Sequence, residues 1–156
     1  MPSLFNDLRI EKGRLAVSVT LMSGTRVDGE LYVQASAHYH GALEDAPELL
    51  NADEPFFPLA LRTGDTVLVA KDNVRSVTVA WNDVHDDETL GISTRVEVAL
   101  RDGERVSGSL FIEPVAGRSR LLDYLNRRQE RFLILFGRES VLLINRVLIE
   151  RVRPIA

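Results

Sequence analysis

The chain has 156 residues, 45% of them hydrophobic, and a formal net charge of −4. This length and composition allow a buried core, whereas the absence of cysteine excludes disulfides, thiolate metal clusters and thiol catalysis. No apolar run approaches about 18 residues, and the first residues lack the basic and long apolar regions of a signal peptide, so we expect a cytoplasmic protein with no membrane partner.

One pattern of residues occurs twice, at 17–31 and again at 96–110. All eight positions that are identical in the two copies set burial or backbone shape, which indicates a duplicated β unit. These identical pairs are Val17 and Val96, Val19 and Val98, Leu21 and Leu100, Gly24 and Gly103, Arg26 and Arg105, Val27 and Val106, Gly29 and Gly108, and Leu31 and Leu110. We therefore predict two small domains, 1–80 and 94–156, joined by an acidic linker at 81–93. Domains of this size are marginally stable alone, so docking or oligomerisation would stabilise them.

The repeated segment has the period of two half-buried strands, because apolar and polar residues alternate on both sides of a glycine-containing turn. In the second copy, the three-residue loop Arg101-Asp102-Gly103 pairs Val98 with Val106 and Val96 with Gly108. A two-residue loop would instead put the apolar sets of the two strands on opposite faces. We predict a type I turn closed by a left-handed glycine, and the same turn in the first copy.

A second glycine interrupts the following strand at an inward position, as Gly29 in one copy and Gly108 in the other. A missing side chain at such a position permits a sharp bend or the close approach of another backbone. The alternative is a simple β-bulge.

A short helix and three further strands are expected after each hairpin. In the first copy we expect the helix at 47–51 and the strands near Phe57, at 66–71 and at 74–79. In the second copy Leu121, Leu122 and Leu125 have helical spacing, with Ser119 as the N-cap. Its strands are expected near Phe132, at 141–145 and at 149–153.

The order of elements, the glycine-closed first hairpin, the glycine in the second strand and the final strand pair resemble the Sm-like small β-barrel over nearly all of each copy. This resemblance implies a mainly β protein of two tandem small, strongly bent antiparallel five-stranded barrels. Each barrel would have a short helix inserted between strands two and three, where typical members have a loop. Sm-like units pair the fourth strand of one unit with the fifth of the next, often in rings that bind RNA. By resemblance, 141–144 and 149–152 would be edges that seek a partner.

The RNA site that the Sm-like resemblance implies has three parts. These are an Asp/Asn-rich loop, an aromatic residue that stacks on a base, and a basic residue followed by glycine between the last two strands. Here that last loop is Asn145-Arg146-Val147-Leu148 in the second copy and Lys71-Asp72-Asn73 in the first. Neither loop contains the glycine, and this departure counts against RNA binding there.

The arginines around the second helix form a candidate site for an anionic partner or RNA: Arg118, Arg120, Arg127, Arg128 and Arg131. Guanidinium groups bind phosphates and carboxylates through paired hydrogen bonds. The alternative is that these side chains cover apolar surface with their stems and pair with Asp123, Glu130 or the acidic linker.

Histidines offer the one candidate metal site. His38 and His40 could present two imidazoles on one strand face, with Glu44 and Asp45 nearby. The alternative is an ordinary surface loop, and we interpret His85 as a linker residue. The sequence shows no nucleophile with a base, no phosphate-binding glycine loop and no defined carboxylate pair, so we expect no enzyme and no cofactor.

These observations favour a non-enzymatic interaction and assembly module that uses exposed β-edges. Its partner would be a second copy of itself, as a homo-oligomer, or another protein. The alternative function is RNA binding through the arginines of the second copy, and a third is metal binding at His38 and His40.

Overall fold

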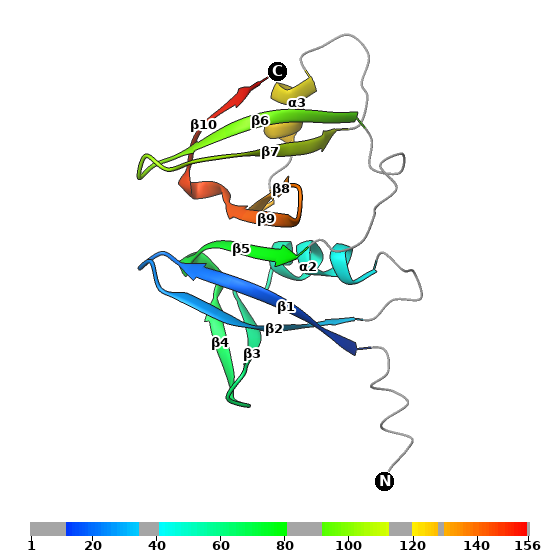
Figure 1. The fold of residues 1–156 in the computed structure, drawn as a ribbon, viewed down its shortest axis with the longest axis vertical. Coiled ribbons are helices and arrows are strands. Elements are labelled where there is room, and N and C mark those ends of the chain that lie inside the picture. The colour runs from blue at the N-terminus through cyan, green and yellow to red at the C-terminus, as the bar shows by residue number, and fades with distance from the viewer. Residues whose placement is uncertain (1–11, 35–40, 81–91, 113–119, 128–129, 156) are drawn as a thin grey trace. The chain divides into compact units, whose positions relative to one another are not determined.

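The computed structural model describes residues 12–34, 41–80, 92–112, 120–127 and 130–155. The protein is mainly β, and its chain divides into two compact units, Met1–Ala80 and Trp81–Ala156 (Figure 1). Most of the predicted linker at 81–93 lies outside the described residues; Ile92 and Ser93 already belong to a strand. Within the described part of the chain, no helix is both long enough and apolar enough to cross a membrane.

The first unit consists of five strands, an α-helix and a 3₁₀ turn. In chain order they are β1 (Lys12–Leu21), β2 (Arg26–Gln34), α2 (Gly41–Asn51), β3 (Phe56–Leu61), β4 (Thr66–Ala70), the 3₁₀ turn Lys71–Asn73 and β5 (Val74–Ala80). The strands are antiparallel and have the spatial order β5-β1-β2-β3-β4.

The second unit repeats this plan. Its elements are β6 (Ile92–Leu100), β7 (Arg105–Ile112), α3 (Arg120–Arg127), β8 (Phe132–Phe136), β9 (Ser140–Asn145), the 3₁₀ turn Arg146–Leu148 and β10 (Ile149–Pro154). The spatial order is β10-β6-β7-β8-β9. The predicted element order, with a helix between the second and third strands, is confirmed in both units. No backbone pairing among the described residues joins the first and last strand of either order, so each sheet is open.

The predicted hairpin turn is confirmed. Val98 lies opposite Val106 and Val96 opposite Gly108. The amide of Gly103 donates to the carbonyl of Leu100 at 2.9 Å, and the φ of Gly103 is 95°. Gly24 closes the first hairpin in the same way, with a φ of 94°. Only glycine adopts this left-handed conformation without strain.

The inward glycines allow the third strand to approach the second closely. A Cβ on Gly108 would lie 2.9 Å from the carbonyl oxygen of Phe136, and a Cβ on Gly29 would lie 2.5 Å from that of Ala60. The pairing of β1 with β2 and of β6 with β7 runs through these glycines without a register shift. The close approach is therefore the role of the glycines, and the bulge alternative is wrong.

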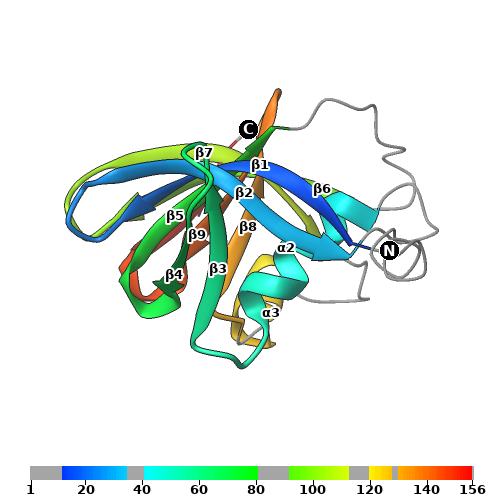
Figure 2. The ribbon, with the colours of Figure 1, turned by 90° about the horizontal axis from the view of Figure 1, so that it is seen from below.

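The core of each unit lies on the inner face of its sheet, where one helix packs against the second strand of the unit. The helix α2 packs against β2 (Figure 2), and α3 packs against β7. The helix α2 begins at Gly41, six residues before the predicted start at Pro47. Ala46 and Leu50, four residues apart on one helix face, are both fully buried. The buried face of α2 therefore extends across Pro47.

Gly108→Val should lower the free energy of unfolding by about 2–4 kcal/mol, because its side chain would displace the backbone at Phe136 and the side chain of Leu135. Ser107→Val is the matched control, since Ser107 is exposed on the same strand and should change stability by at most about 0.5 kcal/mol. Denaturant unfolding followed by circular dichroism measures both. Equal effects of the two substitutions would show that Gly108 is not a packing constraint.

Candidate functional site

The strand β4 is an exposed edge of the first unit. Among the described strands it has one hydrogen-bonded neighbour, β3. Its residues Thr66, Val67 and Leu68 are exposed, and the other two are half-buried. A strand with an unpaired backbone edge and exposed apolar side chains is a template for another strand.

The strands of the two units can be aligned residue by residue. The backbone amide of Lys71 donates to the carbonyl of Pro55, just before β3, and the amide of Arg146 donates to that of Arg131, just before β8. These equivalent hydrogen bonds show which residues of the two units correspond. Leu68 then corresponds to Leu143, and Phe56 corresponds to Phe132. Leu68 is 70% exposed and Phe56 56%, whereas Leu143 and Phe132 are both 0% exposed. Identical side chains at equivalent positions are thus buried in the second unit and open to solvent in the first.

An apolar groove of about 360 Å³ opens beside β4. Its lining residues come from four strands and the 3₁₀ turn: Val19, Leu21, Val27, Phe56, Val67, Leu68, Val69, Ala70 and Asn73. Only Asn73 among these has a polar side chain. The groove therefore suits an apolar side chain of a bound strand or turn.

The basic residue between the last two strands has an internal role in each unit. Lys71 is fully buried, and its Nζ donates to the carbonyls of Leu49 at 2.8 Å and Ala52 at 3.0 Å, at the end of α2. Arg146 donates from Nη2 to the carbonyl of Leu125 at 2.7 Å, near the end of α3. Cations at a helix C-terminus satisfy its free carbonyls and interact favourably with its dipole. These two side chains attach the helices, where the Sm resemblance would place an RNA contact.

The predicted arginine site falls partly outside the described residues, which exclude Arg118 and Arg128. The helix α3 begins at Arg120 and ends at Arg127, which is exposed. Arg131 is half-buried and lies just before β8.

The histidines of the predicted metal site, His38 and His40, lie outside the described residues, and so does His85. The part of the chain that is described contains no group of three or more metal-binding side chains.

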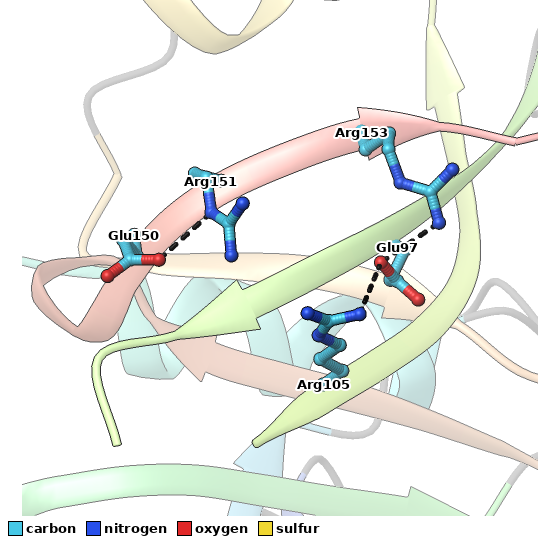
Figure 3. A network of polar contacts seen from close by, with 5 residues as sticks. All are labelled: Glu97, Arg105, Glu150, Arg151 and Arg153. Atoms are coloured by element: carbon cyan, nitrogen blue, oxygen red, sulfur yellow. Dashed lines mark hydrogen bonds and ion pairs between the residues drawn. The ribbon is translucent and has the colours of Figure 1, made fainter. Parts of the chain in front are cut away.

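The second unit has a cationic outer face that the sequence analysis missed. Arg105 on β7 and Arg151 and Arg153 on β10 lie here on either side of β6, which carries Glu97 (Figure 3). A carboxylate oxygen of Glu97 accepts from Arg153 at 3.1 Å and is 3.9 Å from Arg105, while Arg151 pairs with Glu150 at 2.9 Å. The alternation along β6 places Arg95 on this face as well.

The same face of the first unit is less basic, although Arg75 stands at the position of Glu150. Ala16, Ser18, Ser76 and Thr78 occupy the positions of Arg95, Glu97, Arg151 and Arg153. Arg14 pairs with Glu30 at 3.3 Å, and Arg26 pairs with Asp28 at 3.1 Å. Hydrogen bonds from Ser18 and then Arg26 lower the pKa of Asp28, which keeps its carboxylate charged. The cluster of Arg95, Arg151 and Arg153 is therefore a property of the second unit and not of the repeated scaffold.

No protein-family model, curated protein or solved structure matches this chain.

Lys71→Met should lower the free energy of unfolding by about 2 kcal/mol, since it removes two hydrogen bonds and leaves their carbonyl acceptors unpaired. Arg62→Met, which replaces an exposed cation in the turn between β3 and β4, is the control and should have little effect. Denaturant unfolding measures the difference. A Lys71→Met protein as stable as the control would contradict this role of the buried amine.

Proposed function

We propose that the protein is a non-enzymatic assembly module of two Sm-like small barrels that associates with further copies of itself through β4. Strand addition to an exposed edge gives affinity through backbone hydrogen bonds, without specialised side chains. The observation that carries the proposal is the exposed apolar edge of β4, where Leu68 is 70% exposed and the strand has one hydrogen-bonded neighbour among the described strands.

The complementary edge is β10. Its one hydrogen-bonded neighbour among the described strands is β6. Pairing of β4 with β10 of another copy is the pairing of a fourth with a fifth strand that the Sm resemblance implies. Because the two edges differ, the contact is heterologous and produces a closed ring or an open filament.

Charge supports this pairing. The strand β4 is flanked by the exposed residues Asp65 and Asp72, whereas β10 carries two exposed arginines, Arg151 and Arg153, and one exposed carboxylate, Glu150. Opposite charges on two edges favour their encounter and disfavour contacts between identical edges, where like charges would meet.

Leu68→Lys should convert the assembled protein to a monomer, because it places a charge on the edge that receives the added strand. Leu122→Lys is the matched control: Leu122 is 57% exposed on α3, and its replacement should leave assembly unchanged. Multi-angle light scattering over a concentration series gives the mass of each protein. A wild-type protein that stays monomeric at high concentration would refute the proposed function.

Single-stranded RNA is a second candidate partner, and it is supported by the cationic outer face of the second unit. The half-buried rings of Phe111 and Phe136 lie on two paired strands of this unit, with centroids 4.8 Å apart. Arginines that bind phosphates beside aromatic rings that stack on bases are typical of single-strand binding. The sequence alternative, with Arg118, Arg120, Arg127, Arg128 and Arg131, belongs to the same unit.

Arg105→Ala/Arg151→Ala should weaken RNA binding and reduce the slope of log K against log salt by about 0.7 for each phosphate that the variant no longer neutralises. Arg14→Ala/Arg26→Ala changes the corresponding face of the first unit and serves as the control. Filter-binding titrations at several salt concentrations provide the slopes. Identical slopes for the wild type and both variants would exclude phosphate binding by this face.

A further inference from the structure

The groove beside β4 is present because the first unit has smaller apolar side chains than the second. Val67, Val69 and Asn73 occupy the positions of Leu142, Ile144 and Leu148. In the second unit these three larger residues belong to the core cluster or pack against it. Compared with the second unit, the first unit has one carbon fewer at two of these positions and a polar side chain at the third. The groove is therefore a feature of the first unit.

The second unit has an exposed apolar side chain at a position where the first unit has a charged one. Val147 lies in the 3₁₀ turn that leads directly into β10, and it is 57% exposed. Its backbone amide donates to Oδ1 of Asn145 at 3.2 Å, which holds the turn in place. The equivalent residue of the first unit is Asp72, a charged residue. The hollow and the projection therefore occur in different units of one chain.

We infer that the groove of the first unit is a socket for Val147 of a second copy, which enters it when β10 of that copy pairs with β4. This inference rests on the proposed assembly through β4 and names the contact that directs it. Burial of an apolar side chain in an apolar groove adds the side-chain specificity that backbone pairing lacks.

The socket also fixes the direction of the added strand. In an antiparallel approach the start of β10 lies beside the end of β4, so the preceding turn brings Val147 to Ala70 and Asn73 in the groove lining. In a parallel approach the same turn would lie beyond Thr66, away from Asn73. The added strand is therefore antiparallel to β4.

Two variants test the socket from opposite sides. Val69→Ile/Asn73→Leu fills the groove with the side chains of the second unit, and Val147→Ser removes the apolar projection. We expect each to raise the Kd of self-association by about tenfold or more, as removal of a buried valine side chain implies. Combining them should give no further increase, because both remove the same interaction. Sedimentation velocity measures the Kd, and Leu122→Ser is the control at an exposed apolar residue outside the edge.

Failure of the socket and failure of assembly give different results. If Leu68→Lys is monomeric while Val69→Ile/Asn73→Leu and Val147→Ser associate as tightly as the wild type, assembly through β4 stands and the socket is refuted. If the wild type is monomeric, both are refuted. Val147 is exposed, so Val147→Ser should fold normally and keeps the test valid if filling the groove impairs folding.

Mixing provides an independent test of the heterologous arrangement. The groove-filled chain retains its Val147, and a Val147→Asp chain retains its open groove. Each should associate weakly alone, and an equimolar mixture should form a dimer through the one intact socket and projection. A mixture that sediments as the sum of its separate components would overturn the inference.

Discussion

Close contact between the backbones of the second and third strands is the constraint on which each unit depends. The carbonyl of Ala60 or Phe136 occupies the space that a side chain on Gly29 or Gly108 would need. This contact brings β3 against β2 and β8 against β7, and it completes the sheet that covers the apolar core. Because glycine alone permits the approach, its position determines where the third strand can pack.

The helix of each unit depends on a second, polar contact at the 3₁₀ turn. Lys71 and Arg146 are chemically different, yet each donates to carbonyls near the end of the preceding helix. A buried cation is costly unless its donors are paired. The inserted helix therefore provides the acceptors that make a buried lysine tolerable, and the lysine in turn satisfies carbonyls that the helix leaves open.

The features that the sequence predicted depend on local spacing. The hairpin register followed from the positions of Gly103 and the alternating valines, and the structure has that register. The exposure of β4 could not be predicted in this way, because Leu68 and Leu143 are the same residue type in similar strands, yet Leu68 is 70% exposed and Leu143 is 0% exposed. Burial of Lys71 depends on carbonyls about 20 residues away. The cationic face depends on the pairing of β10 with β6, which joins residues 56 positions apart.

Duplication gives the two units one scaffold, and divergence gives them complementary surfaces. Even two identical units would leave a fourth strand and a fifth strand as different edges, and divergence gives these two edges distinct side chains. Here the first unit combines an acidic edge with a hollow, and the second combines a basic edge with the projecting Val147. Each edge therefore disfavours its own kind and accepts the other. The smaller side chains of β4, and Val147 in place of Asp72, therefore add side-chain selectivity to a direction that the strand order already provides.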